Sequence, residues 1–121
     1  PNIRTQYIIE AQTHKNNLQN ILHKHSGLKR RNWFVNNIKG LGMKEASHYL
    51  RNIGYQNYAI IDTHILSILQ NYSIIKKPKT ITKNKYLQIE HKLKKIADQT
   101  GLTLAKLDLY LWYMETGLIL K

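Results

Sequence analysis

Two glycines separated by a single residue, Gly40 and Gly42, interrupt a chain whose apolar residues otherwise recur at helical spacing. The stretches on either side, Asn32 to Ile38 and Lys44 to Ile53, each predict a helix. Alternating strand patterns joined by two-residue turns are missing from the sequence. We therefore predict an all-α fold in which residues 32–53 form a helix, a glycine hairpin and a second helix.

Further helices are predicted from the same spacing, from side chains that cap helix starts and from glycines that end helices. In order, the predicted elements are a first helix over Arg4 to about His25 that ends before Ser26-Gly27, a helix from Asp62 toward Leu69, a lysine-rich linker over Ile74 to Asn84, a helix from Lys85 to Gln99 closed by Gly101, and a last helix capped by Thr103 and ended by Gly117. A chain of 121 residues with 42% hydrophobic content has the size of one domain. We expect a single all-α domain over residues 1–121.

The charge of the chain indicates a polyanionic partner. Lysine and arginine number 19 against 7 acidic residues, which leaves a net charge of +12 with histidines neutral. Such an excess in a chain of this size is common in nucleic-acid-binding proteins. A membrane surface would also attract it, but the basic helix with a concentrated apolar face that such binding needs is not found. We predict double-stranded DNA as the partner and no membrane.

The sequence contains no cysteine. A disulfide, a thiolate zinc site and a cysteine-ligated iron-sulfur cluster are therefore excluded. The six histidines show no convincing metal-ligand spacing, so we expect neither a metal nor an organic cofactor. No signal-peptide pattern is present, and we expect an intracellular monomer of the cytoplasm or nucleoid. The initial residue is Pro1, which suggests processing or a fragment.

The hairpin residues Lys39, Gly40, Leu41, Gly42 and Met43 are candidates for binding a DNA phosphate. Glycines allow close backbone approaches that side chains obstruct, and the amino end of the following helix attracts anions. The alternative is an ordinary turn between helices. The carbonyls of the loop could also hold a structural monovalent cation. Two glycines followed by lysine and alanine within a basic helical chain favour the phosphate site.

Lys44 and Asp62 are the candidate catalytic residues. Lys44 follows the hairpin in the first turn of a helix, where its amine could reach a sugar beside the held phosphate and attack it once deprotonated. Asp62 would position groups, transfer a proton and stabilise positive charge on the opening sugar. The alternative for Asp62 is a helix N-cap, and one residue can serve both purposes. His64 is expected to be structural or to face a phosphate, and is not proposed as the base.

Trp112 and Lys121 are candidates for recognising a base. The indole of Trp112 has tyrosines on both sides in the sequence, and stacking on an extruded base is worth about 1 to 3 kcal/mol. Spacing alone favours core packing for Trp112 and an ordinary frayed end for Lys121.

The segment from Trp33 to about Leu69 resembles the helix-hairpin-helix superfamily that includes endonuclease III. The resemblance rests on Gly40-Leu41-Gly42-Met43-Lys44 and on Ile61-Asp62-Thr63-His64-Ile65, and it makes residues 32–53 the helix-hairpin-helix motif. The absence of cysteine rules out the iron-sulfur branches of that superfamily.

A narrower resemblance covers most of residues 29 to 121. The chain is similar to the second, largely archaeal class of 8-oxoguanine DNA glycosylases. The runs that carry this similarity are Gly42-Met43-Lys44-Glu45-Ala46-Ser47-His48, Leu50-Arg51-Asn52, Leu107-Asp108-Leu109, Leu111-Trp112-Tyr113-Met114-Glu115-Thr116-Gly117 and the closing Lys121. Members of this class carry a further helical portion before the stretch that matches Pro1, so we expect a glycosylase fold that lacks its N-terminal helical portion, or a C-terminal fragment of one domain.

The resemblance implies base excision repair by a bifunctional DNA glycosylase and abasic-site lyase. It implies that Lys44 forms a Schiff base, that Asp62 is its catalytic partner, and that β-elimination then cuts the strand. It also implies that Trp112 contacts the damaged base and that the terminal carboxylate of Lys121 helps to recognise it. The substrate expected is DNA containing 8-oxoguanine.

Two other functions remain open from the sequence. A noncatalytic helix-hairpin-helix module would need only the glycines and the positive charge to grip a DNA backbone. A related lyase acting on oxidised pyrimidines would use the same lysine and aspartate.

Overall fold

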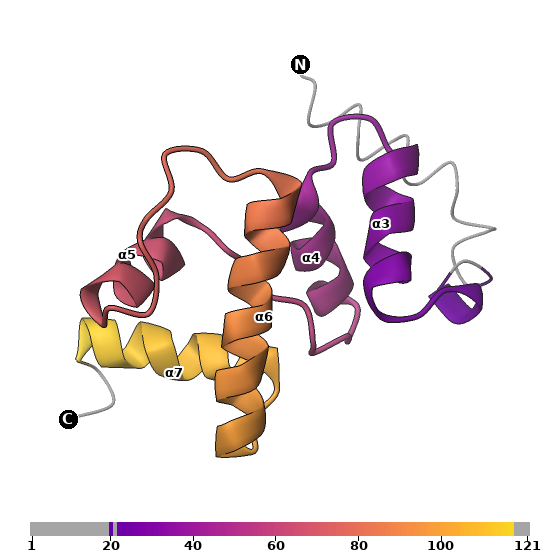
Figure 1. Ribbon diagram of the computed structural model, residues 1–121. Helices are drawn as coiled ribbons and strands as arrows, with labels where there is room; N and C mark the ends of the chain where they lie inside the picture. The colour runs from indigo at the N-terminus through magenta and orange to yellow at the C-terminus, as the bar shows by residue number, and fades with distance from the viewer. Residues whose placement is uncertain (1–19, 21, 118–121) are drawn as a thin grey trace. The chain divides into compact units, whose positions relative to one another are not determined.

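The computed structural model describes residues 20 and 22–117, and every regular element in that part of the chain is a helix (Figure 1). The helices are α3 (Gly27–Asn37), α4 (Met43–Asn52), α5 (Thr63–Asn71), α6 (Lys83–Thr100) and α7 (Leu104–Thr116). The all-α prediction is therefore confirmed. The chain divides into two compact units, Pro1–Ala46 and Ser47–Lys121, and the division falls inside α4. None of the described helices is both long and apolar enough to cross a bilayer.

Local sequence signals set most helix ends. Thr103 begins α7 as predicted, with its hydroxyl accepting a backbone N–H of the first turn. Gly101 and Gly117 end α6 and α7 in the left-handed region, with φ of 73° and 72°. The predicted start of α6 at Lys85 is slightly late, because the hydroxyl of Thr82 accepts the Lys85 N–H and caps the helix earlier.

The first hairpin helix is longer than predicted. The expected span was 32–38, but α3 runs from Gly27 to Asn37, and Gly27 begins a helix where a stop was expected. Residues 28–31, between Gly27 and the predicted start of the helix, are leucine, lysine and two arginines. These residue types favour helix, and Arg31 is fully buried. Of the helix predicted over Arg4 to His25, residues 20 and 22–24 are helical and most of the remainder lies outside the described residues.

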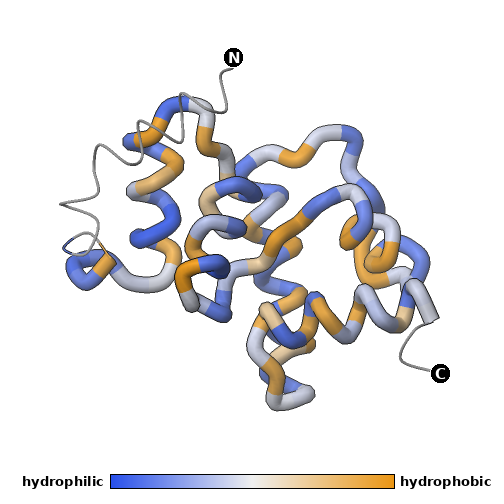
Figure 2. Tube along the Cα trace, turned by 180° about the vertical axis from the view of Figure 1, so that it is seen from behind, coloured by the Kyte–Doolittle hydropathy of each residue, from blue (hydrophilic) through white to orange (hydrophobic). Residues whose placement is uncertain are grey.

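The second unit is built around α7, against which both α5 and α6 pack (Figure 1). Figure 2 shows apolar and polar residues interspersed along the chain. The buried apolar residues of the second unit are Leu50, Tyr58, Ala59, Ile61, Ile65, Leu66, Ile68, Leu69, Tyr86, Ile89, Leu93, Ala97, Leu104, Leu107 and Leu111. This core holds α5 and α6 against α7.

Two connections lead into the helices of this core. The segment 55–62 between α4 and α5 has no helical turn and runs inside, with Tyr58, Ala59 and Ile61 buried. The stretch between α5 and α6 is the predicted lysine-rich linker, although Lys83 and Asn84 at its end belong to α6. The first connection delivers Asp62 to the start of α5.

Candidate active site

The glycine hairpin forms as predicted. Gly40 has φ of +82°, a conformation that L side chains rarely adopt. The Leu41 N–H donates to the Ile38 carbonyl at 3.2 Å, which closes the turn. The carbonyl of Gly42 accepts the Ala46 N–H at 2.9 Å, so Gly42 flanks α4, which begins at Met43.

The five hairpin residues differ in what they present to solvent. Lys39 and Gly40 are exposed, Leu41 and Gly42 are half-buried, and Met43 is buried in the core. The side chain of Met43 therefore packs in the core and does not face solvent. Any phosphate contact by Met43 would involve its backbone.

Lys44 is exposed and occupies the first turn of α4. The next residue, Glu45, turns its carboxylate back toward the hairpin: a Cβ added to Gly42 would lie 2.8 Å from the Oε1 atom of Glu45. An acidic residue in the first turn is favoured by the helix dipole. Sequence analysis did not single out Glu45, although its place three residues after Gly42 is the usual one for such a carboxylate.

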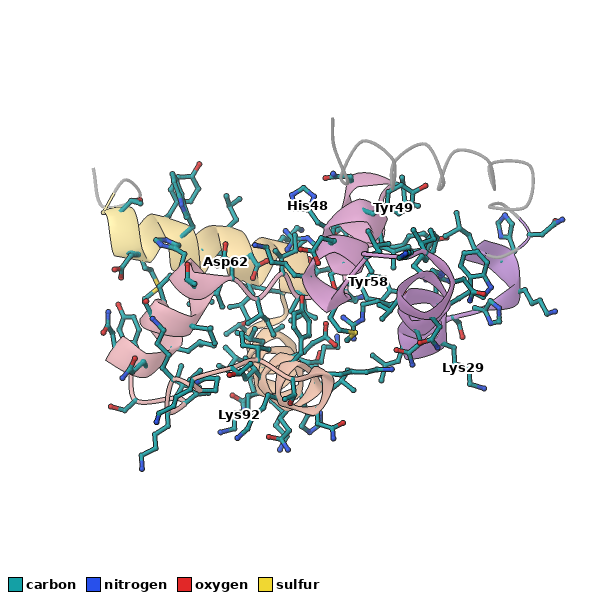
Figure 3. The ribbon with its side chains drawn as sticks, turned by 90° about the horizontal axis from the view of Figure 1, so that it is seen from above. Lys29, His48, Tyr49, Tyr58, Asp62 and Lys92 are labelled. Carbon is teal, nitrogen blue, oxygen red and sulfur yellow. The ribbon has the colours of Figure 1, made fainter. Side chains whose placement is uncertain are left out.

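Asp62 is the N-cap of α5 and is half-buried (Figure 3). Its backbone is extended, with φ of −109°, and its Oδ1 atom accepts the Ile65 N–H at 2.9 Å. The capping role predicted for Asp62 is confirmed. Its Oδ2 atom accepts no hydrogen bond from any residue that the structure describes.

The segment before Asp62 is held by two polar side chains of α6 that sequence analysis missed. Glu90 is buried and its Oε2 atom accepts the Ala59 N–H at 2.8 Å. The hydroxyl of Tyr86 accepts the Ile61 N–H at 3.2 Å and donates to the Ala59 carbonyl. These bonds fix the backbone that delivers Asp62.

An ion pair that sequence analysis also missed joins α4 to α7. The guanidinium of Arg51 binds the carboxylate of Asp108, and the two side chains are 19% and 15% exposed. Burial raises the pKa of Asp108, and the nearby charge of Asp62 raises it further, whereas Arg51 and a hydrogen bond from the Ile60 N–H oppose that rise.

The remaining predicted site residues occupy different parts of the chain. His64 is half-buried in the first turn of α5, and its Nε2 atom is buried with no partner among the described residues. Trp112 is 43% exposed on α7, with its ring edge-on to Tyr113 at a centroid distance of 5.4 Å. Core packing, which spacing alone favoured for Trp112, is therefore wrong. Lys121 lies outside the described residues.

Lys44 belongs to the first unit of the chain, whereas Asp62, His64 and Trp112 belong to the second. Among the described residues, no three histidine or acidic side chains are grouped as a metal site would require. The groups suited to chemistry are therefore the exposed amine of Lys44 at the start of α4 and the carboxylate of Asp62, which uses only its Oδ1 atom for capping.

Comparison with known proteins shows the family. The family model described as 8-oxoguanine DNA glycosylase matches residues 1–102. The 8-oxoguanine DNA glycosylase/AP lyase of Korarchaeum cryptofilum is 48% identical over 123 residues, which cover all of this chain and 59% of that protein. This chain thus spans less than two thirds of that relative's length.

Two solved structures agree with this comparison. The Methanocaldococcus jannaschii 8-oxoguanine glycosylase/lyase, crystallised with a 15mer DNA containing 8-oxoguanine, matches with a TM-score of 0.82 and 46% identity over 94% of this chain and 56% of that one. The 8-oxoguanine DNA glycosylase of Thermotoga maritima matches with a TM-score of 0.79 and 39% identity over 92% of this chain and 53% of that one. The chain belongs to the 8-oxoguanine DNA glycosylase family.

Proposed function

We propose that this chain removes 8-oxoguanine from DNA and then cuts the strand at the abasic site. The observation that carries the proposal is the presence of Lys44 and Asp62 within the part of the chain that matches the family model. Relatives that match 100% and 98% of the chain are named 8-oxoguanine DNA glycosylase/AP lyase. One solved relative holds DNA with the same lesion.

DNA would first be held through its phosphates. The amides at the start of α4 offer donors to one phosphate, and the Lys39 side chain beside them is exposed. Further exposed lysines lie in the linker and on α6; they are Lys76, Lys77, Lys79, Lys83, Lys85, Lys92 and Lys95. Because such contacts release counterions, duplex affinity should fall steeply with salt.

The damaged base would then leave the stack. Extrusion costs a few kcal/mol, and stacking on an indole returns about 1 to 3 kcal/mol. Trp112 is exposed enough to offer a ring face to an extruded base. We therefore assign base recognition to Trp112, and the terminal carboxylate of Lys121 as a second contact.

The chemistry would begin with neutral Lys44. Its Nζ atom attacks C1′ of the sugar, the bond from C1′ to the base breaks, and the departing base takes a proton from water. Opening of the sugar ring then gives an iminium, and the proton that Nζ releases is passed to the ring oxygen. Loss of a proton from C2′ and departure of the 3′ phosphate complete the β-elimination. Asp62 would stabilise the positive charge on the sugar and accept the proton that Lys44 releases.

Borohydride trapping tests the nucleophile, because it reduces the iminium to a stable amine. The parent chain incubated with an 8-oxoguanine duplex and borohydride should give a covalent complex, and Lys44→Gln should give none. Lys106→Gln, an exposed lysine of α7, is the matched control and should trap like the parent. Trapping by Lys44→Gln at the parental level would refute the assignment.

Asp62→Asn tests the carboxylate. Asparagine caps helices about as well as aspartate, so the start of α5 should persist while the charge is lost. We expect slower single-turnover excision with lesion affinity largely retained. Parallel loss of affinity and rate would instead make Asp62 a structural cap alone.

A panel of duplexes separates the rival functions. Preference for 8-oxoguanine over oxidised pyrimidines supports the proposal, and the reverse preference favours the related lyase. Tight binding to undamaged duplex without any trapping would indicate a noncatalytic module. All the groups invoked come from one chain, so we propose that it acts as a monomer on the DNA of the nucleoid.

A further inference from the structure

The stretch of chain just before Asp62 is buried but has no helical turn of its own. Ala59 and Ile61 are both buried, and the whole segment 55–62 lies outside the helices. Buried backbone N–H and C=O groups nearly always have a hydrogen-bond partner. A stretch outside helices and sheets must therefore find such partners in side chains or other parts of the chain.

Two buried side chains of α6, one helical turn apart, supply these partners. The Oε2 atom of Glu90 accepts the Ala59 N–H at 2.8 Å. The hydroxyl of Tyr86 donates to the Ala59 carbonyl and accepts the Ile61 N–H at 3.2 Å. A carboxylate as buried as that of Glu90 is costly unless it is well bonded. The pair thus ties three backbone groups of the segment to one helix.

Asp62 is consequently held on both sides along the chain. After it, the Ile65 N–H donates to its Oδ1 atom at 2.9 Å, and the Leu66 N–H donates to its carbonyl at 3.0 Å. Before it, the Ile61 N–H is bonded to Tyr86. The first set orients the carboxylate relative to α5, and the second sets where the residue lies relative to α6. Misplacing a reacting group by 1 Å can slow a reaction about 100-fold.

We propose that Glu90 is a positioning residue for Asp62, with Tyr86 as its companion. The two side chains place the Asp62 carboxylate for its reaction without touching the DNA themselves. This role rests on the catalytic role proposed for Asp62, and it gives α6, a helix that carries no reacting group, control over the rate of excision.

Two substitutions of Glu90 keep or remove the acceptor. Glu90→Gln keeps an oxygen for the Ala59 N–H, so single-turnover excision of 8-oxoguanine should stay near the parental rate. Glu90→Leu removes the acceptor and should slow excision about 10- to 100-fold, with affinity for the lesion duplex unchanged. Rates are compared well below the melting temperature of each variant. Tyr86→Phe, which keeps the aromatic ring, should also slow excision and replaces Glu90→Leu if that variant does not fold.

Ala97→Gly is the matched control for a loss of stability alone. Ala97 is buried on the same face of α6, two helical turns after Glu90, and its methyl group can make no hydrogen bond to residues 59–61. Glycine weakens a helix, so this variant should melt below the parent but excise at the parental rate. The proposal is overturned if Ala97→Gly slows excision as much as Glu90→Leu, or if Glu90→Leu and Tyr86→Phe both excise at the parental rate.

Amide hydrogen exchange in the free chain tests the position of Asp62 without DNA. The Ile65 N–H is bonded to the Asp62 carboxylate, whereas the Leu69 N–H lies later in α5. Glu90→Leu and Tyr86→Phe should speed exchange at Ile65 relative to Leu69, because a less fixed carboxylate caps the helix less well.

The same exchange ratio separates this inference from the proposed function. Ala97→Gly should leave the ratio of Ile65 to Leu69 exchange at the parental value. If the parent chain never excises a base, the proposed function fails, while the ratio still decides whether α6 fixes Asp62. A ratio that Glu90→Leu and Tyr86→Phe leave unchanged refutes the link even in an active enzyme.

Discussion

Removing one oxygen atom, in Tyr86→Phe, should loosen the segment that leads into Asp62. The Tyr86 side chain is buried, and its hydroxyl accepts the Ile61 N–H at 3.2 Å and donates to the Ala59 carbonyl. The Oγ atom of Ser47 lies 3.3 Å from the same hydroxyl. Phenylalanine fills the same space but leaves two buried backbone groups without these partners.

The size of the effect follows from those two groups. Leaving one buried donor or acceptor unsatisfied costs about 1–3 kcal/mol, and slight relaxation of the backbone lowers the sum for two, so we expect a loss of about 2–3 kcal/mol. For a single domain of intermediate length, each kcal/mol lost from the free energy of unfolding lowers the melting temperature by about 3–5 °C. Tyr86→Phe should therefore melt roughly 6–15 °C below the parent.

Circular dichroism melts and amide hydrogen exchange measure this effect. The Ile61 amide should exchange faster in Tyr86→Phe, since it loses its acceptor. Tyr72→Phe removes an exposed hydroxyl and should melt like the parent. Equal melting temperatures for the two variants, together with an unchanged Ile61 amide, would refute the reasoning that this hydroxyl holds the segment.

Three further predictions concern the hairpin, base recognition and pH. Gly40→Ala should destabilise the chain by about 1–2 kcal/mol in thermal melts because of its positive φ, whereas Gly42→Ala should cost less, since its added Cβ meets only the terminal oxygen of a flexible side chain. Trp112→Ala should weaken binding to lesion duplexes relative to undamaged ones by about 1–3 kcal/mol with little change in melting, and Met114→Ala, exposed on the same helix, should leave both unchanged. Because burial raises the pKa of Asp108 above its unfolded value, its contribution to stability is fully present below the unfolded pKa of about 3.9 and is lost as pH rises through the folded value. The melting temperature of the parent relative to Asp108→Asn should therefore fall as pH rises from the acid range to neutrality.

The helix ends could be predicted because their signals act within one turn of the chain. Asp62 and Thr103 each accept an N–H from three residues later, and Gly101 and Gly117 adopt a conformation that other residues avoid. The start of α3 could not be predicted in the same way. Its Ser26 N-cap makes no side-chain capping bond, and the residue that follows is Gly27, a type that more often ends a helix.

The support of the candidate site could not be predicted, because it depends on contacts distant in sequence. Arg51 and Asp108 are 57 positions apart. One usable signal was overlooked: Glu90 follows Tyr86 by one helical turn and lies among the apolar residues of α6, where a carboxylate needs a buried partner. The exposure of Trp112 could also have been predicted, because Trp112 lies one residue after Leu111, which belongs to the buried face of α7.

Capping and catalysis by Asp62 are compatible because a carboxylate has two oxygens. The Oδ1 atom is held by the Ile65 N–H, and the helix dipole favours the negative charge, while the Oδ2 atom has no protein donor among the described residues. Capping therefore orients a charge that remains available to a sugar.

Three substitutions at Asp62 separate the two roles. Asparagine and serine both cap helices well, whereas alanine loses about 1 kcal/mol of capping. If the charge is what chemistry needs, Asp62→Asn, Asp62→Ser and Asp62→Ala should lose excision to a similar degree, and only the alanine variant should also lose stability. The opposite outcome is that the asparagine and serine variants remain active and only the alanine variant is inactive. Activity would then depend on capping strength, and the role of Asp62 would be limited to fixing the start of α5.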